Sequence, residues 1–388
     1  SNNLGAEQDL IDDPVLGFGR DPLAPIRDVI SDTGDIVVPL DPRYMGFWLT
    51  GLFGDPASAD VPAEGSIVFD ALPQENDTIT INGTVFTFVS GTAAGDEIEI
   101  QGTLIQTIDE AVTVLNNSTD NDVDVATYSR ATGTEILTIT HDTAGAAGNA
   151  FTLAASRSTV SADTLQGGGT EHKFLSGKLD LPSYSLEVGM PEVPAFFVHV
   201  GTMLNSIAFD FQQSGAAAAT INAIAQGEDR FAVTQGGTPQ SLAFKRIGQF
   251  HGAIKSAGER LANVTAASVN YSNNLETIPE IRDDLKIGGS DPTIGSFTGS
   301  IETRFANTEM LDKAISGTPI DLEFSYTPEP GLRIVLEAHE AHLKRPKTPV
   351  TGPGGIQASF DFQGSLNTAA GQMLTVSLVN DLDGSQYA

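Results

Sequence analysis

A strand that runs into a helix is predicted by the stretch Asp35-Ile-Val-Val-Pro-Leu-Asp-Pro-Arg-Tyr-Met-Gly-Phe-Trp-Leu-Thr-Gly-Leu-Phe-Gly54. A β-branched run comes first, and Asp41 and Pro42 then supply a capping carboxylate and a first-turn proline. Apolar residues recur at helical spacing up to Gly54, which can end a helix with a positive φ. We interpret Trp48, the only Trp, as a core residue of this helix.

The same order of elements recurs in the second part of the chain. Gly34-Asp-Ile36, a strand, a cap and a helix are matched by Gly299-Ser-Ile301, a strand, Asn307 as the cap, and a second helix. Near the ends of the two halves, residues 214–227 align without gaps on residues 351–364. We interpret this match as an internal duplication, in which each copy is a strand-helix-strand unit finished by antiparallel strands.

Residues 66–165 interrupt the first half and are interpreted as a separate α+β unit. Two short alternating strands on either side of Asn82-Gly83 predict a hairpin, because this pair accepts the positive φ angles of a type I′ turn. Thr103 and Gln106 have the spacing of a capping box and precede one apolar stripe. We expect the glycines at 167–169 to form a flexible linker. Further strands of this unit are expected around 123–128, 135–140 and 151–154.

The rest of the chain is predicted to be mostly strands. Residues 1–35 have weak periodicity, so we expect an arm and loops there rather than core. Four alanines at 216–219 could start a helix, but Thr220, Ile221 and the alternation after them favour a strand. Strands are also expected at 181–188, 195–200 and 206–211, and from about 241 to the end.

These elements predict a mainly β fold class. It comprises two tandem β domains, each with one helix, and one small inserted α+β module. Residues 1–65 and 170–240 form the first domain, residues 66–169 form the module, and residues 241–388 form the second domain.

Composition excludes several classes of function. The 388 residues include 50 acidic and 20 basic side chains and no Cys, for a net charge of −30. Tight nucleic-acid binding would need clustered Lys and Arg, and disulfides, zinc thiolate sites and thiol nucleophiles would need Cys. The N-terminal sequence is acidic and lacks the pattern of a signal peptide, and no apolar run approaches the roughly 18 residues that cross a bilayer. We therefore expect a soluble, non-secreted protein without membrane contact.

The sequence predicts no catalytic, cofactor-binding or metal-binding residue. His339 and His342 are three residues apart, whereas a zinc protease helix needs four, and in a strand they would point to opposite faces. The segment Asp120-Asn-Asp122-Val-Asp124 begins like a calcium loop. However, Val125 and Ala131 occupy the positions where that loop needs Gly and Glu, so we interpret it as a polar turn.

Two other motifs also fall short of a site. Gly17-Phe-Gly19 is not followed by the third glycine of a dinucleotide turn. The basic cluster Lys344-Arg345-Pro-Lys347 is too short for a nucleic-acid site, and we expect it to contact a carboxylate-rich neighbour within the fold or on another subunit. Carboxylates are so numerous that no chosen pair indicates a glycosidase.

Residues 35–54, quoted above, resemble the start of the major tail tube proteins of long-tailed, siphovirus-like bacteriophages. Two segments of the inserted unit, Asp77-Thr-Ile-Thr-Ile-Asn-Gly-Thr-Val-Phe-Thr-Phe88 and Ala144-Gly-Ala-Ala-Gly-Asn-Ala-Phe-Thr-Leu153, resemble a small module that recurs as an insertion in phage tail proteins. Later segments are similar to that tube family in the same order: Leu181-Pro-Ser-Tyr-Ser-Leu-Glu-Val-Gly189, Leu204-Asn-Ser-Ile-Ala-Phe-Asp-Phe211 and Gly352-Pro-Gly-Gly-Ile-Gln-Ala-Ser-Phe-Asp-Phe-Gln363.

This resemblance implies tail-tube-type domains, each built as a β-sandwich or half-barrel, that close into six-domain rings and stack into a conduit for DNA in the virion tail. It transfers no functional residue, because the function of this family belongs to a surface. If each chain supplies two of six positions, a trimer with pseudo-sixfold symmetry is expected rather than a hexamer of chains. Other tail proteins are the further expected partners, and assembly is expected in the host cytoplasm.

The net charge agrees with a conduit. A wall that repels phosphate lets DNA pass without tight binding, so we expect acidic side chains to dominate the lumen and the module to lie on the exterior. Solubility alone could also explain the charge. Two other classes stay open: a surface or secreted β-rich adhesion protein with the module as its binding unit, and an acidic carbohydrate-active enzyme.

Overall fold

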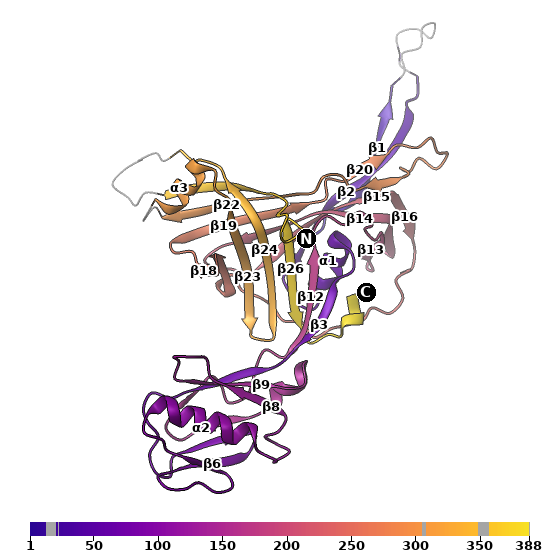
Figure 1. The fold of residues 1–388 in the computed structure, drawn as a ribbon. Coiled ribbons are helices and arrows are strands. Elements are labelled where there is room, and N and C mark those ends of the chain that lie inside the picture. Colours follow the sequence, from indigo (N-terminus) through magenta and orange to yellow (C-terminus); the bar gives the residue numbers. More distant parts are fainter. Residues whose placement is uncertain (13–20, 22, 305–307, 348–356, 388) are drawn as a thin grey trace.

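The computed structural model describes residues 1–12, 21, 23–304, 308–347 and 357–387. Within these residues, 16 strands join in one sheet whose main path runs β1-β2-β15-β14-β19-β22-β25-β24-β23-β17-β18 (Figure 1). The predicted mainly β fold class is therefore confirmed. The strands of this sheet are β1 (Gly5–Ile11), β2 (Ile26–Pro39), β3 (Ala57–Val61), β12 (Gly169–Leu175), β13 (Tyr184–Met190), β14 (Ala195–Phe211), β15 (Ala218–Ala225), β16 (Gly227–Phe231), β17 (Gly252–Ser256), β18 (Glu259–Arg260), β19 (Val264–Ser272), β22 (Ser296–Arg304), β23 (Ile320–Glu329), β24 (Leu332–Leu343), β25 (Gln357–Gly364) and β26 (Leu374–Asn380).

The sheet folds into two layers around one hydrophobic core. β24 belongs to both layers, because its first part pairs with β26 and its end pairs with β25. The second layer continues from β26 through β12 to β3. The core between the layers draws buried residues from both halves of the chain, including Phe209, Phe297 and Phe360. The two expected tube domains thus share one sheet and one core.

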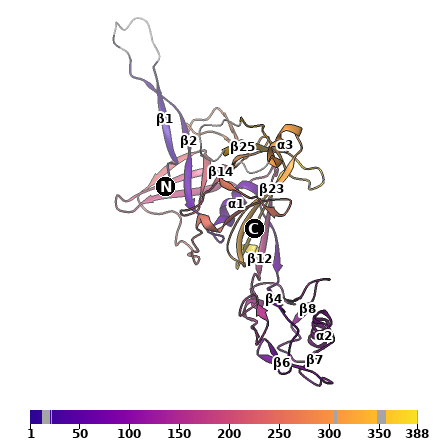
Figure 2. The same ribbon diagram turned by 90° about the vertical axis from the view of Figure 1, so that its left-hand side faces the viewer.

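The N-terminal residues form a long hairpin, contrary to the expectation of an arm made of loops. β1 pairs antiparallel with β2 along its whole length, and β15 pairs with β2 only from Pro39 to Asp32. The part of the hairpin beyond Asp32 projects from the body as an arm (Figures 1 and 2). Leu4, just before β1, is buried in the core, so the expectation that this region lacks core residues was also wrong.

The predicted helix after Pro42 is α1 (Met45–Phe53). It begins later than expected, and the Asp41 carboxylate accepts hydrogen bonds from the backbone N–H groups of Arg43 and Tyr44 in the turn before it. Gly54 ends the helix with a φ of 72°. α1 packs against β14 and β12, between the two layers, and Trp48 packs partly buried against the core.

The two halves of the large sheet repeat the same order of strands. β1-β2-β15-β14 in the first half corresponds to β19-β22-β25-β24 in the second, and β14 pairs with β19 where the halves meet. The helices α1 and α3 (Glu309–Ser316) follow the equivalent strands β2 and β22. The residues expected to cap the second helix and to begin the second aligned segment, Asn307 and 351–356, lie outside the described residues.

Close backbone packing explains why Gly34 and Gly299 occupy equivalent positions in the two halves. Asn2 bridges Ile36 in the first half, and Ala267 pairs with Ile301 in the second. A Cβ atom on Gly34 would lie 2.7 Å from the backbone oxygen of Asn3, and a Cβ on Gly299 would lie 2.1 Å from that of Ser268. Because the preceding strand crosses so closely in both halves, only glycine fits at either position.

The inserted module has its own core below the large sheet (Figure 1). The Asn82-Gly83 hairpin has the predicted register, with positive φ at both turn residues. The helix is capped as predicted, since Thr103 Oγ1 accepts a hydrogen bond from the Gln106 N–H. The elements of the module are β4 (Glu64–Val68), β5 (Thr78–Ile81), β6 (Thr84–Val89), β7 (Glu97–Glu99), α2 (Leu104–Asn116), β8 (Ala126–Ser129), β9 (Ile136–His141), β10 (Leu153–Ala155) and β11 (Thr159–Val160).

The connection to the module is an ordered β-ladder, so the expectation of a flexible glycine linker was wrong. Val61 of β3 pairs directly with Gly169 of β12. Gly168 exchanges two hydrogen bonds with the side chain of Asn149. A Cβ on Gly168 would lie 2.4 Å from the backbone oxygen of Gly145, so this glycine permits close packing rather than flexibility.

Candidate functional surface

One side of the large sheet is open and polar. Along β25, residues alternate between buried and exposed, with Phe360 and Phe362 in the core and Asp361 on the open side. Strand pairing aligns equivalent residues of six strands, and we call this surface the polar face. Its members are Thr33, Asp35, Val37, Ala218, Thr220, Asn222, Ile224, Ser206, Ala208, Asp210, Ser268, Asn270, Ser272, Thr298, Ser300, Glu302, Ser359, Asp361 and Gln363, and Glu7 of β1 continues it.

Hydrogen bonds between neighbouring strands hold the side chains of the polar face in place. Asn222 donates to the Asp35 carboxylate at 2.8 Å and accepts from Asn205 at 3.0 Å. The hydroxyls of Ser268 and Ser300 lie 3.0 Å apart across β19 and β22. These bonds fix several short side chains of the polar face and use part of their capacity to bind a ligand.

The charge of the polar face is negative. It carries the five carboxylates Glu7, Asp35, Asp210, Glu302 and Asp361, all from different strands. Basic residues lie only at its margins among the described residues: Arg27 lies on the arm at the start of β2, Arg304 ends β22, and Lys344 follows β24. The Lys344 ammonium lies 3.6 Å from the Asp361 carboxylate, with both side chains mostly exposed.

The arm at one end of the sheet exposes apolar side chains. Leu10, Ile11, Ile26 and Val29 all have exposed side chains on the paired strands, and Leu10 is 63% exposed. Acidic residues alternate with them, as in Asp9, Asp12 and Asp28. An exposed apolar strand pair of this kind marks an interaction surface.

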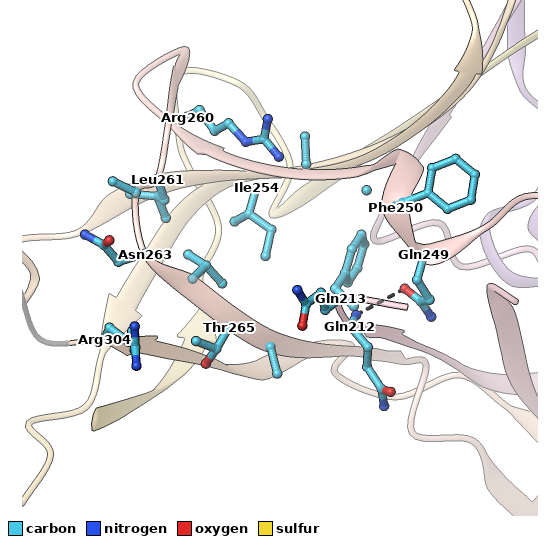
Figure 3. Close-up of a pocket in the computed structure, with 16 residues that line it drawn as sticks. Gln212, Gln213, Gln249, Phe250, Ile254, Arg260, Leu261, Asn263, Thr265 and Arg304 are labelled. Carbon is cyan, nitrogen blue, oxygen red and sulfur yellow. Dashed lines mark hydrogen bonds between the residues drawn. The ribbon is translucent and has the colours of Figure 1, made fainter. Parts of the chain in front are cut away.

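A hollow of about 680 Å³ lies at the other end, where β14 ends and β19 begins (Figure 3). Phe211, Ile254 and Leu261 contribute apolar walls, and Arg260 and Arg304 contribute positive charge. None of its 16 lining residues is acidic. In a chain with a net charge of −30, this hollow is a basic and partly apolar exception.

A buried hydrogen-bonded pair of side chains holds the base of the arm to the body. His199 of β14 and Asp32 of β2 are both buried, with His199 Nδ1 2.9 Å from the Asp32 carboxylate. The other ring nitrogen, Nε2, is buried without a hydrogen-bond partner among the described residues. The pair fixes the point from which the arm projects.

The histidines considered as metal ligands are separated. Both lie on β24, where His339 binds the Thr375 hydroxyl at 2.7 Å and His342 lies 3.2 Å from the Glu340 carboxylate. The prediction that they occupy a strand and not a helix is confirmed. In the described part of the chain, no group of three or more His, Asp or Glu side chains is placed to hold a metal ion.

The acidic segment at 120–124 forms a turn. Asp120 accepts hydrogen bonds from the Asp122 N–H and the Thr84 hydroxyl, which lowers the pKa of its carboxyl. Val123 is buried in the core of the module. The polar-turn interpretation is therefore confirmed, while Gly17-Phe-Gly19 lies outside the described residues.

The sequence comparison gives the family. A family model described as phage tail tube protein matches residues 2–364. The chain belongs to the phage tail tube protein family. It is a structural component of the phage tail, where it associates with copies of itself and with other tail proteins. No curated protein matches the sequence significantly.

Membership of the tail tube family explains why the functional region of this protein is a surface. The arm was predicted, but its paired strands were not. The polar face was not predicted from the sequence, because it contains no motif of reactive residues. The alternation in Gln357-Ala-Ser-Phe-Asp-Phe-Gln363 was the available signal, because it places Ser and Asp opposite Phe on one strand. None of the helices in the described residues of this tail tube protein is long and apolar enough to cross a membrane.

Proposed function

We propose that three chains close into a ring of six tube domains, and that these rings stack into a tube that conducts DNA. The proposed domains are residues 1–65 with 170–240 and residues 241–388, with residues 66–169 as the inserted module. The single observation that carries this proposal is the repeated strand order, in which β14 pairs with β19 between the halves. Each chain then supplies two successive positions of the ring.

In the proposed ring, the contact between two chains repeats the β14–β19 pairing that joins the two halves of one chain. β14 and β19 pair over six residues, from Ser206↔Ser272 to Phe211↔Ala267. The counterparts of these strands are β24 and the N-terminal strand, which lie at opposite ends of the repeated set. Pairing the end of β24 with the N-terminal strand of the next chain would continue the sheet around the ring.

The polar face is the proposed wall of the lumen. The core and the second layer cover the opposite side of the sheet, so in a closed ring the polar face is the side left for the channel. Its small polar side chains and its excess of carboxylates suit a channel for DNA, because phosphates find few cations to bind.

The position of the module relative to the polar face indicates where the module lies on the tube. The module is connected to β3 and β12 in the second layer, away from the polar face, so its proposed place is the tube exterior (Figure 1).

The arm and the basic hollow lie at opposite ends of the sheet, and we propose that the hollow of one ring binds the arm of the next ring. Apolar Leu10 and Ile11 suit its walls, and Asp12 and Asp28 complement Arg260 and Arg304.

Imaging of assembled tubes along their axis tests this function. We expect rings with three identical chains, six similar lobes and three exterior modules. Six identical chains in one ring, each with a single lobe, would disprove the trimer, and a lumen lined chiefly by Lys and Arg would disprove the assignment of the polar face. A chain that stays monomeric at high concentration, alone and with phage tail extracts, would disprove the assembly itself.

A further inference from the structure

The end of β24 has one open edge. Its counterpart β14 has β15 on one edge and β19 on the other at its C-terminal half. β24 has β25 and β26 on the first edge, and β23 on the second only as far as the Ile320↔Ala341 pair. Beyond Ala341, no described strand pairs with this second edge.

The N-terminal strand has the matching open edge. The bridge between Asn2 and Ile36 is equivalent to the pair Ala267↔Ile301, so residues 2–7 correspond to 267–272. In β19 the outer edge of residues 267–272 is occupied by β14. Among the described strands, none pairs with the outer edge of residues 2–7 or of β1, where the Ala6 N–H donates a hydrogen bond of 3.5 Å to the Glu228 carboxylate.

The two open edges carry opposite charges. After β24 the chain continues as Lys344-Arg345-Pro346-Lys347, in which all three cations are exposed. The side chain of Lys344 is 78% exposed, and its single ion pair within the described residues is the 3.6 Å contact with Asp361. The other edge carries Glu7 and Asp9, both exposed and without an ion pair among the described residues.

We propose that Lys344, Arg345 and Lys347 of one chain bind Glu7 and Asp9 of the next chain and thereby lock the ring. This inference rests on the proposed ring and names the contact that closes it. In the register of β14 on β19, the basic segment lies beside residues 6–9 of the neighbour. The occupant of the basic edge is thus a second copy of this chain.

The lock differs in chemistry from the junction within the chain. The 12 residues that pair there, Ser206–Phe211 and Ala267–Ser272, contain one charged side chain, Asp210. That junction is held within a single chain and one shared core and needs no electrostatic guidance. Chains with a net charge of −30 repel each other before they meet, so opposite charges at the edges favour the correct approach.

Salt should therefore open the rings. Exposed ion pairs are screened over about 8 Å at physiological ionic strength and about 3 Å at 1 M. We expect the fraction of closed rings to fall by about tenfold between these conditions, because the loss of several close ion pairs at each of three contacts outweighs the screening of the longer-range repulsion between chains. Salt-independent rings would overturn the ionic lock and leave the ring proposal intact.

Charge exchange provides the specific test. The full chain is compared with Lys344→Glu/Lys347→Glu, with Glu7→Lys/Asp9→Lys, and with the four changes combined, by mass photometry at low salt. Each pair alone should reduce closed rings at least tenfold, and the combination should restore them to within about twofold of the parent. A matched control, Arg157→Glu/Lys173→Glu, makes the same change in net charge as Lys344→Glu/Lys347→Glu but away from the edges, and should leave the rings unchanged.

Disulfide trapping gives a second readout that does not depend on affinity. The chain contains no Cys, so Ala6→Cys/Lys347→Cys introduces the only thiols. Under oxidising conditions this variant should give covalent trimers on non-reducing gels, whereas Ala6→Cys/Arg157→Cys should not. Rings without cross-links, or with no loss on charge reversal, would overturn the lock alone. A parent chain that forms no rings under any condition would overturn both the lock and the proposed function.

Discussion

The two copies of the repeat place their helices equivalently but bury them differently. α1 has six buried residues, whereas α3 has none. β12 and the C-terminal turn at Gly384–Tyr387 pack onto α1, while α3 packs only its partly buried Met310, Leu311 and Ala314 against the core. We infer that the first copy supplies much of the stability of the fold, whereas the second copy leaves more of its surface available for contacts with partners.

The largest expected effect comes from truncating a side chain in the two helices. Leu49 of α1 is completely buried, so Leu49→Ala should lower the free energy of unfolding by about 3 kcal/mol. Leu311 of α3 is only partly buried, so Leu311→Ala should cost less than about 1 kcal/mol. Urea unfolding of both variants measures the difference, and equal losses would contradict the unequal roles of the two copies.

A slightly smaller effect is expected at the paired glycines. Gly299→Ala should destabilise by about 2 kcal/mol, because its Cβ would lie 2.1 Å from a backbone oxygen inside the sheet. Gly34→Ala should cost about half as much, because the strand that it meets lies at the outer edge and can shift. Thermal unfolding compares the two, and a larger loss at Gly34 would reverse this order.

A smaller effect is expected at the ion pair that joins the halves. Arg43, just before α1, binds Asp381, just after β26, at 2.6 Å and 3.0 Å. The hydrogen bonds from Arg43 lower the pKa of the Asp381 carboxyl. The pair therefore stabilises the fold above the unfolded pKa of about 3.9, and this contribution is lost as the pH falls through the lower folded value.

Asp381→Asn measures this contribution. Because Asp381 is about half exposed, solvent screening limits the difference between parent and variant to about 0.5–1 kcal/mol at pH 7. The difference should shrink as the pH falls below about 4. A difference that stays constant or grows on acidification would show that the ion pair is not its source.

The smallest effect is expected from removing the module, which only the first copy contains. Val61 and Gly169 are directly paired, so replacing residues 62–168 by Asn-Gly leaves a hairpin with a two-residue turn. The module has its own core, so the shortened chain should stay soluble and assemble as the parent does. Size-exclusion chromatography and negative-stain imaging check this, and an aggregated product would show that the module supports the first copy.

The sequence predicted the elements whose signals are local. Asn82-Gly83 fixes its hairpin within 12 residues, and Thr103 starts α2 by bonding its own turn. The strand at 218–225 was also predicted, because Thr220 and Ile221 favour an extended chain over the helix that the alanines suggested. Such signals act over a few residues and do not depend on the rest of the fold.

Elements that depend on distant partners were missed. The β1–β2 hairpin joins strands separated by 14 residues, too many for a short turn motif to set their pairing. β14 was predicted as two strands because the sequence does not show which partners lie along it. The glycines at 167–169 resembled a linker, since their need to pass Gly145 and Asn380 exists only in the folded chain. The polar face was missed for the same reason: it exists only when six strands are in register.

The ladder between Val61 and Gly169 makes the module easy to exchange in evolution and in engineering. The chain enters and leaves the module at two neighbouring residues of one ladder, and closing even a long loop between them costs free energy only in proportion to the logarithm of its length. A different domain whose ends lie close together could be spliced between them without changing the register of β3 or β12. On a trimeric ring, each such graft would be displayed three times per layer and held in a fixed direction by an ordered pair of strands.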